Sequence, residues 1–184
     1  MKNVYVFLAT GFEEIEALTP ADILRRAGID VKLVSVTGSE IVTGARGINV
    51  KADVLFENIE KDWADLLVLP GGMPGTVNLL AFEPLMNLVK EYNEKGERIA
   101  AICAAPTIFG KNGLLQGKKA TCYPGMEGDL IGADACEESV VTDGNITTSR
   151  GMGTALDFSL ELLTLLSGSK EKADKMAEAV VYFP

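Results

Sequence analysis

The chain has 184 residues, of which 47% are hydrophobic and 23% charged, a composition typical of one globular domain. Its net charge of −9 repels phosphate backbones, and no apolar run approaches the roughly 20 residues that span a bilayer. The N-terminal segment also turns acidic where a secretory peptide would carry a small-residue cleavage site. We therefore expect a single cytoplasmic domain over residues 1–184, with neither nucleic acid nor membrane as a partner.

Short apolar runs alternate with helical segments along the chain, beginning with a strand at residues 3–9. Residues 13–28 have apolar positions at helical spacing and end at Gly28, which predicts an amphipathic helix. Pro20 falls inside this segment, where a proline kinks or splits a helix. Glycines spaced through β-formers at residues 38–59 predict a hairpin or small antiparallel excursion. The remaining predicted strands are 30–37, 65–72, 98–103, 118–123, 138–143 and 145–151, and the remaining helices are 84–96, 106–115, 154–168 and 170–182.

This alternation predicts an α/β three-layer sandwich whose central sheet is mainly parallel and covered on both faces. Ligands of such sheets bind beyond the carboxyl ends of the strands. The stretches "ATGFEE", "LPGG", "CAAP", "CYPG" and "SRGMG" each follow a predicted strand. We expect these stretches to converge on one site.

The chain contains no histidine and only three cysteines. A Cys–His dyad, a Ser–His–Asp triad and a histidine metal site are therefore excluded. Cys103, Cys122 and Cys136 are scattered without a C-x-x-C motif, which argues against structural zinc. The low, odd count fits free thiols in a reducing compartment. We expect neither a metal nor another cofactor.

Cys103 ends the predicted strand 98–103 and precedes a helix that begins near Pro106. The first N–H groups of a helix lack internal partners and carry the positive end of its dipole, which favours a thiolate. Cys103 in this position is expected to have a lowered pKa and to be reactive. The alternative is that Cys103 is a small buried hydrophobic residue.

Glu16 lies on the first predicted helix, which starts at the same end of the sheet. Glu13 shares its helix face, whereas Glu14 points elsewhere. The surrounding apolar residues predict a buried Glu16 carboxyl, which would resist ionising, could donate a hydrogen bond to a neighbouring thiolate and could then exchange protons with a substrate. Alternatively, all three acids decorate a solvated helix start, which is the interpretation we favour for Glu13 and Glu14.

Gly71 and Gly72 follow the strand at 65–69 and allow backbone N–H groups to face a pocket. Such donors stabilise the oxyanion that develops when a carbonyl carbon is attacked, although a glycine pair also occurs in plain turns.

Five other residues have looser assignments. Arg46 and Arg150 could hold an anionic group at the rim of the pocket, or could pair with surface acids. Cys122 and Tyr123 end a predicted strand at the same edge and are interpreted as wall residues. Cys136 lies in an acid-rich loop and is interpreted as incidental.

The segments "GFEEIEALTPADILRRAG", "LVLPGGMPG", "AAICAAPTIFGKNGLLQGKKAT" and "TTSRGMGTALDFSLELLTLLSG" together resemble the ThiJ/PfpI superfamily. The resemblance covers nearly the whole chain and is specific to the branch of the parkinsonism-linked protein deglycase and its bacterial relatives. It implies a flavodoxin-like fold and usually a homodimer. It also implies a reactive cysteine at Cys103, a partner glutamate at Glu16, and oxyanion donors at Gly71, Gly72 and Ala104.

The departures from the superfamily pattern narrow the function. The protease and amidotransferase branches place a histidine near the cysteine, and this chain has "CAAP" instead. A cysteine protease or an amidotransferase-like hydrolase is therefore disfavoured. Tyr123 fills a position where the deglycase branch often has histidine. No Walker loop supports the thiazole monophosphate synthesis that the ThiJ label suggests.

These observations predict a cofactor-independent cysteine enzyme that acts on small reactive carbonyls or glycated adducts, of the glyoxalase or deglycase type. Cys103 would be the nucleophile and Glu16 the proton shuttle. The alternative is an oxidative-stress sensor or chaperone that works through oxidation of Cys103. The apolar last helices suggest a subunit contact, although core packing explains the helix at 154–168 equally well.

Overall fold

The computed structural model describes residues 2–183 and contains a seven-stranded sheet in the order β10–β11–β7–β6–β1–β2–β5. Every neighbouring pair is parallel except β10 and β11, which are antiparallel. The strands are β1 (Asn3–Leu8), β2 (Asp30–Ser35), β5 (Val54–Leu55), β6 (Leu66–Leu69), β7 (Arg98–Ile102), β10 (Val140–Asp143) and β11 (Ile146–Ser149). The structure thus has the predicted α/β architecture with a mainly parallel central sheet.

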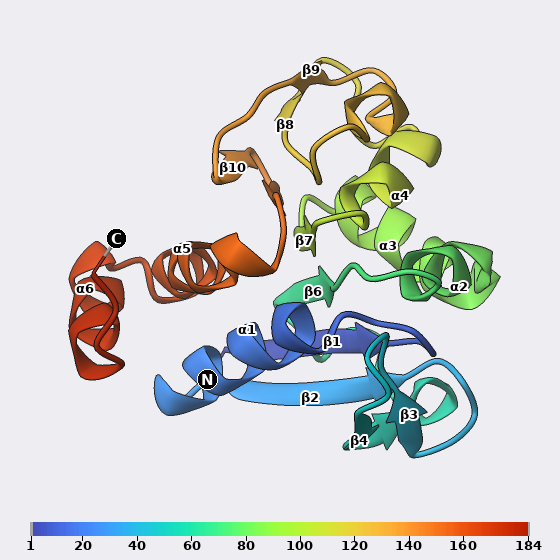
Figure 1. Cartoon of the computed structure of the whole chain (residues 1–184), viewed down its shortest axis with the longest axis horizontal. Helices are drawn as coiled ribbons and strands as arrows, with labels where there is room; N and C mark the ends of the chain where they lie inside the picture. Colours follow the sequence, from blue (N-terminus) through green and yellow to red (C-terminus); the bar gives the residue numbers. More distant parts are fainter. Residues whose placement is uncertain (1, 184) are drawn as a thin grey trace.

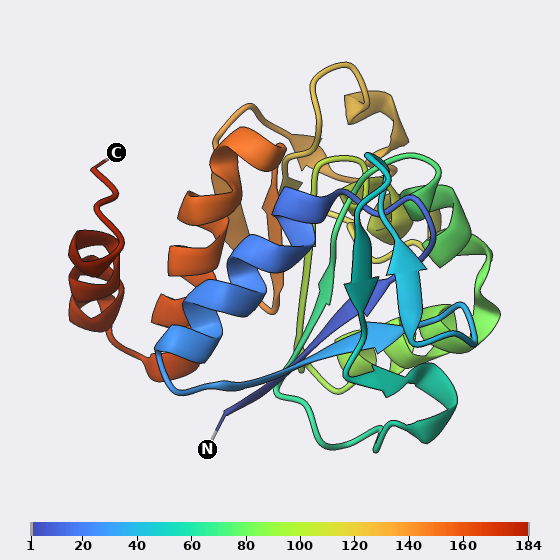
Figure 2. The same cartoon turned by 60° about the horizontal axis from the view of Figure 1, so that its bottom comes forward.

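Helices cover both faces of this sheet, as Figures 1 and 2 show. One face packs against α1 (Glu14–Arg26) and α5 (Ala155–Ser167), with α6 (Lys170–Ala179) outside them against α5. The other face packs against α2 (Gly75–Ala81), α3 (Glu83–Glu94) and α4 (Pro106–Lys111). The three layers are therefore helix, sheet and helix.

Strand β1 shows why the strands of the central sheet appear in the sequence as continuous apolar runs. Tyr5 and Phe7 enter the core beneath α3, whereas Val4, Val6 and Leu8 enter the core beneath α1 and α5. A strand buried on both faces needs apolar residues at every position, so the alternation of a half-exposed strand is absent.

Of the two effects expected of Pro20, a kink or a split of the first helix, the structure excludes the split. Helix α1 runs without interruption through Pro20, which is buried against the core. A proline inside a helix removes one backbone hydrogen bond, and its ring crowds the carbonyl four residues earlier. The helix ends just before Gly28, whose φ of +79° and N–H bond to the Arg25 carbonyl terminate it as predicted.

Residues 118–123 do not form another strand of the central sheet, in contrast to the sequence prediction. Only β8 (Lys119–Ala120) is extended, and it pairs with β9 (Asp134–Ala135) in a separate two-stranded sheet. The next residue, Thr121, donates its N–H to the hydroxyl of Thr148 on β11. At Thr121 a side-chain hydroxyl therefore accepts the hydrogen bond that a backbone carbonyl would accept in a continuous strand.

The predicted hairpin is present as β3 (Ile41–Thr43) and β4 (Asn49–Lys51), which are antiparallel. The Gly11 N–H donates to the Thr43 carbonyl over 2.8 Å, and the Ala45 N–H donates to the Phe12 carbonyl over 2.7 Å. These bonds tie the hairpin to the loop that follows β1.

Short 3-10 turns complete the fold at Phe56–Asn58, Glu127–Asp129 and Met152–Thr154. Within residues 2–183, no helix combines the length and apolarity that crossing a membrane requires.

Candidate active site

Cys103 lies in a sharp turn between β7 and α4, at the carboxyl end of the central sheet. Its φ is +66°, a left-handed conformation that residues other than glycine rarely adopt. The Cys103 N–H donates to the Ser149 carbonyl over 3.0 Å, and the Cys103 carbonyl accepts the Tyr123 N–H over 2.8 Å. Two neighbouring segments therefore hold the thiol in a backbone geometry of the kind that clusters at functional sites.

Glu16 lies beside this thiol, on the first turn of α1. Its side chain is only 1% exposed, and its Oε2 accepts the Gly71 N–H over 3.0 Å. The carboxyl and the Cys103 thiol are within hydrogen-bonding reach of each other. Glu13 caps the helix by accepting the Glu16 N–H over 2.7 Å, which orients the start of α1.

Burial controls the ionisation of this pair. Desolvation raises the pKa of Glu16 to about 7, against the lowering effect of its hydrogen bonds to Cys103 and Gly71. Desolvation and the adjacent Glu16 carboxyl raise the pKa of Cys103 to about 12. The Glu16 result agrees with the sequence prediction of a carboxyl that resists ionising.

The raised pKa of Cys103 contradicts the prediction of an acidic thiol. The N–H groups of Ala104 and Gly72 face the sulfur and lower its pKa, but they are outweighed by burial and by Glu16. Helix α4 has only six residues and begins at Pro106, so its dipole contributes little. The pair consequently gives up one proton near neutral pH and strongly resists losing the second.

The predicted oxyanion donors divide into two groups. Gly72 and Ala104 direct their N–H groups at the sulfur and line the pocket. The Gly71 N–H is instead taken by Glu16, which corrects its assignment as an oxyanion donor. Gly71 has a different role, because a Cβ there would lie 2.7 Å from both the Cys103 Cβ and the Glu16 Oε2. Its lack of a side chain lets the acid and the thiol meet.

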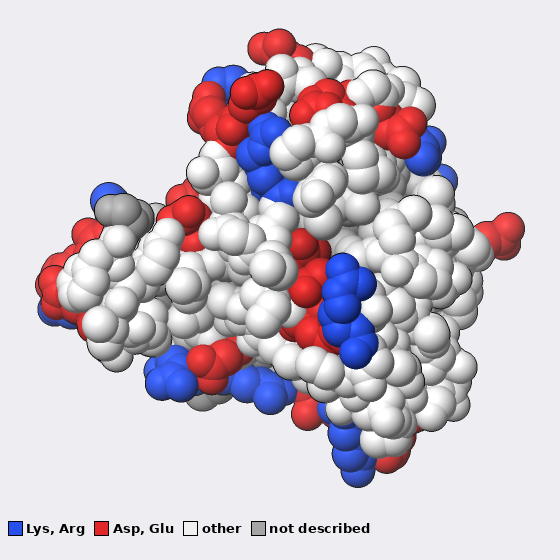
Figure 3. All heavy atoms as spheres, in the orientation of Figure 1, with Lys and Arg blue, Asp and Glu red and all other residues white. Residues whose placement is uncertain are grey.

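The space above Cys103 is a cavity of about 570 Å³. In Figure 3 acidic side chains gather at the floor of a central hollow, with basic side chains beside them. The cavity is lined by Glu13, Glu16, Ala45, Arg46, Gly72, Met73, Cys103, Ala104, Tyr123, Met126 and Met152. Stretches far apart in the sequence therefore meet at this site, as the sheet topology predicts.

Arg46 and Tyr123 line the cavity as the sequence suggested, whereas Arg150 does not. The Nη2 atom of Arg150 lies 3.6 Å from the Glu127 carboxylate, so this arginine adopts the alternative of pairing with an acid. Cys122 is fully buried behind the wall of the pocket and Cys136 lies outside it, and both thiols are free.

Two acids differ from the expectation of a solvated helix start. Glu13 lines the cavity, and Glu14 is only 4% exposed. The Glu14 Oε1 accepts the Arg46 N–H over 2.8 Å, which fastens the β3–β4 hairpin to α1. Sequence periodicity placed Glu14 on another face of the helix but could not reveal that the hairpin would cover that face.

Sequence analysis also missed the methionines around the cavity. Met73 and Met152 occur inside the "PGGMPG" and "SRGMG" stretches, and Met126 follows "CYPG". Their position beside the glycines of these predicted site stretches is the sequence feature that could have identified them. Each is an ordinary apolar residue by itself, and only the fold brings the three together.

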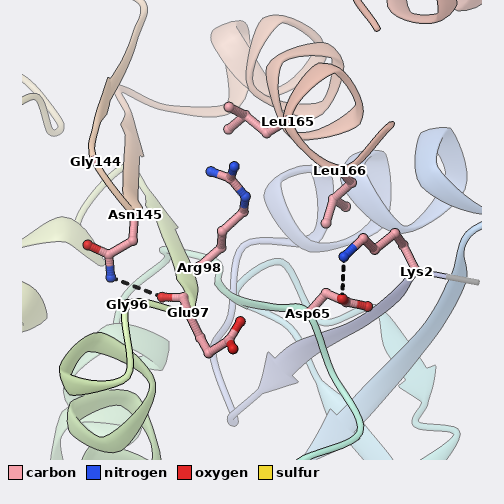
Figure 4. Close-up of a pocket in the computed structure, with 9 residues that line it drawn as sticks. All are labelled: Lys2, Asp65, Gly96, Glu97, Arg98, Gly144, Asn145, Leu165 and Leu166. Carbon is pink, nitrogen blue, oxygen red and sulfur yellow. Dashed lines mark hydrogen bonds and ion pairs between the residues drawn. The ribbon is translucent and has the colours of Figure 1, made fainter. Parts of the chain in front are cut away.

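A second hollow of about 300 Å³ lies at the opposite end of the sheet (Figure 4). There Lys2 and Asp65 form an ion pair of 2.6 Å, and Asn145 donates to the Glu97 carbonyl over 2.9 Å. This hollow has no thiol in its lining, so the candidate chemistry belongs to the Cys103 end. Across residues 2–183, no group of three or more Cys, Asp or Glu side chains is arranged to hold a metal ion.

Comparisons with known proteins identify the family of this chain. The DJ-1/PfpI family model matches residues 2–165, and the chain belongs to that family. It is 44% identical to Protein DJ-1 homolog B of Arabidopsis thaliana over 100% of this chain, but spans only 42% of that protein's length. It is 36% identical to a protein named a deglycase from Pyrococcus abyssi, covering 89% of this chain and 99% of the relative.

Among solved structures, the chain is similar to oxidized Toxoplasma gondii DJ-1, with a TM-score of 0.95 and 38% identity. That match covers all of both chains. Family membership and the α/β fold are therefore established together.

Proposed function

We propose that this protein is a cofactor-independent cysteine enzyme that converts reactive dicarbonyls, free or as glycated adducts, into hydroxyacids. The observation that carries the proposal is the convergence of the Cys103 thiol, the Glu16 carboxyl of raised pKa, and the N–H groups of Gly72 and Ala104. A nucleophile, a proton carrier and an oxyanion site are the parts this chemistry needs. The family relative named a deglycase supports the same reaction class.

The reaction begins from the pair that has lost one proton. When the remaining proton resides on Glu16, Cys103 is a thiolate and its sulfur attacks the aldehyde carbon, forming an S–C bond. The carbonyl π electrons move to oxygen, where the N–H groups of Gly72 and Ala104 stabilise the charge. Glu16 then donates its proton to that oxygen, giving a hemithioacetal.

Rearrangement and release follow without imidazole, because the chain contains no histidine. The Glu16 carboxylate takes the proton from the carbon bonded to sulfur and returns it to the neighbouring carbon, while the hydroxyl proton of the adduct passes to the former ketone oxygen. This transfer converts the adduct into a thioester of a hydroxyacid. Water hydrolyses the thioester, releasing the hydroxyacid and restoring the Cys103 thiol. A pKa of about 7 suits Glu16 to act as both acid and base near neutral pH.

The test is turnover of methylglyoxal to lactate by Cys103→Ser. We expect a loss of at least about 1,000-fold, because a serine hydroxyl ionises far less readily than a thiol and is a far weaker nucleophile than a thiolate. Cys136→Ser is the matched control, since its thiol lies outside the cavity, and it should retain full turnover. Unchanged turnover in Cys103→Ser would refute the proposal.

A second candidate function uses the same sulfur as an oxidation sensor. The N–H groups of Gly72 and Ala104 and the Glu16 carboxyl would hydrogen-bond the oxygens of a sulfinate at Cys103. Mass spectrometry after mild peroxide treatment discriminates between the two candidates. Selective addition of two oxygens at Cys103, with negligible carbonyl turnover, would favour the sensor. The three free cysteines fit a reducing compartment such as the cytoplasm.

We also propose that two copies of the chain pair through the outer face of α1. Ile15 on this face is 49% exposed, and a neighbouring groove of about 450 Å³ includes Leu18, Leu156 and Val180. Sedimentation of the wild type should give twice the monomer mass, and Ile15→Lys should shift it toward monomer. A monomeric wild type would exclude this pairing.

A further inference from the structure

Three methionines line the cavity above Cys103. Met73 follows β6, Met126 precedes the turn Glu127–Asp129, and Met152 starts the turn before α5. We call these residues the methionine collar. Met73 is 58% exposed and Met152 is 61% exposed, which is high for large apolar side chains. The chain has six methionines, so half of them line this one pocket.

The cavity is larger than a three-carbon dicarbonyl requires. Its volume of about 570 Å³ lies in the range of pockets that enclose ligands of drug-like size, roughly 300–1,000 Å³. Glu13, Glu16 and the backbone N–H groups that face the sulfur provide polar contacts near the thiol. A methylglyoxal bonded to Cys103 would therefore leave the space bordered by the collar unfilled.

The side chains around that space favour an apolar, flat group. Thioethers are polarizable and make favourable contacts with aromatic rings. Tyr123, which is 52% exposed, adds an aromatic face to the same wall. A Cβ added at Gly151 would lie 3.6 Å from the Tyr123 ring and 4.0 Å from the Glu16 Oε1, so this glycine keeps open the space between the ring and the acid.

We propose that the methionine collar makes the site selective for α-oxoaldehydes whose ketone carbon carries an aryl or long alkyl group. This inference rests on the proposed function and adds to it the class of substrate. The aldehyde carbon reacts at Cys103, while the apolar group lies against Met73, Met152 and the Tyr123 ring. With phenylglyoxal as the substrate, addition of one water gives mandelate, with no external oxidant or reductant.

The test compares initial rates with phenylglyoxal and methylglyoxal. The wild-type kcat/KM should be at least about tenfold higher for phenylglyoxal, which is the discrimination that a few apolar contacts supply. The double variant Met73→Ala and Met152→Ala should lower this ratio about tenfold, mainly through the KM for phenylglyoxal. Restoring apolar bulk with Met73→Leu and Met152→Leu should recover most of the ratio.

Two further variants separate contact from general damage. Gly151→Ala adds a methyl group at ordinary contact distance in an extended backbone, so it should narrow the site and reduce phenylglyoxal turnover selectively. Met176 lies on α6, outside the cavity. Met176→Ala should therefore leave kcat/KM unchanged for both phenylglyoxal and methylglyoxal. A wild-type ratio of one or less, or a ratio insensitive to the double variant, would overturn the inference while leaving Cys103 chemistry intact.

Product binding keeps the two proposals distinguishable if turnover fails. In that case the proposed function is wrong, and the collar is tested by calorimetry with mandelate against lactate. Tighter binding of mandelate that is lost in the double variant supports an apolar-group site. Equal affinities for mandelate and lactate would overturn the inference. A change in the sedimentation of the double variant would also overturn it, because the collar would then be a subunit contact.

Discussion

The two ends of the central sheet contain ionisable groups in opposite environments. At the amino end, Asp65 accepts the Lys2 Nζ over 2.6 Å and the Asn3 N–H over 2.8 Å, and both charged side chains are partly exposed. At the carboxyl end, Glu16 is buried beside Cys103, and among the described residues it has no ion pair with lysine or arginine. At the amino end the Asp65 carboxylate is paired with a lysine, whereas at the carboxyl end the Glu16 carboxyl is buried with no cationic partner among the described residues.

This difference separates a structural polar cluster from a candidate catalytic one. A paired, half-exposed carboxylate adds a little to stability, whereas a buried acid beside a thiol costs stability when it ionises. Strongly perturbed pKa values of this kind concentrate at functional sites. The hollow at the amino end in Figure 4 is thus explained by ordinary surface pairing.

Among changes that leave both the Cys103 thiol and the Glu16 carboxyl in the chain, the largest expected effect comes from separating the acid from the thiol. Gly71→Ala places a Cβ 2.7 Å from the Cys103 Cβ and 2.7 Å from the Glu16 Oε2. We expect a loss of turnover of about 100-fold, because misplacement by about 1 Å costs that much. Gly128→Ala is the control, since nothing lies within 4 Å of its added Cβ. Wild-type activity in Gly71→Ala would mean that the contact between acid and thiol is dispensable.

The stability of the fold should depend on pH through Glu16. Its pKa rises from 4.5 in the unfolded chain to about 7 in the folded protein, so the folded state binds more protons between these values. The free energy of unfolding should therefore fall by about 3 kcal/mol from pH 4.5 to above pH 7. Urea unfolding of Glu16→Gln at pH 5 and pH 8 should lack this part of the pH dependence. If the free energy of unfolding changed with pH by the same amount in Glu16→Gln and in the wild type, the pKa assigned to Glu16 would be wrong.

Catalysis should follow the first ionisation of the same pair. We expect kcat/KM for methylglyoxal to rise about tenfold per pH unit below 7, and to level off above it, because Cys103 and Glu16 together lose one proton there. A pH–rate profile measures this inflection. The inflection should disappear in Glu16→Gln, where only the thiol still titrates. A profile without a break near 7 would remove Glu16 from the rate-determining chemistry.

The smallest effect is expected at the amino end. Asp65→Asn removes the ion pair with Lys2, whose side chain is 53% exposed. Exposed pairs contribute about 1 kcal/mol or less and are screened by salt. Thermal unfolding at low and high salt should detect this small change, while methylglyoxal turnover stays at the wild-type level. A large loss of turnover would mean that the two ends of the sheet are coupled.

Local sequence signals explain much of the fold and of the site. Continuous apolar runs marked β1 and β7, and Gly28 marked the end of α1, because burial on two faces and a left-handed C-terminal residue each leave a local signature. Cys103, Glu16 and Gly72 were predicted to be neighbours because each lies in a segment that follows the carboxyl end of a parallel strand. The prediction at residues 118–123 was wrong because Thr121 bonds to a side chain of another strand, which no local pattern encodes.

By itself the sequence determined the alternation of strands and helices, the absence of imidazole, and the position of one cysteine at a strand–helix turn, since these depend on residue order and type alone. Only the tertiary structure decided the charge state of the site. Whether a thiol is acidic depends on the water and charges around it, and here burial and Glu16 outweigh the amides of Gly72 and Ala104. The fold likewise decided that the Gly71 N–H binds Glu16, that Arg150 pairs with Glu127, and that three distant methionines border one cavity.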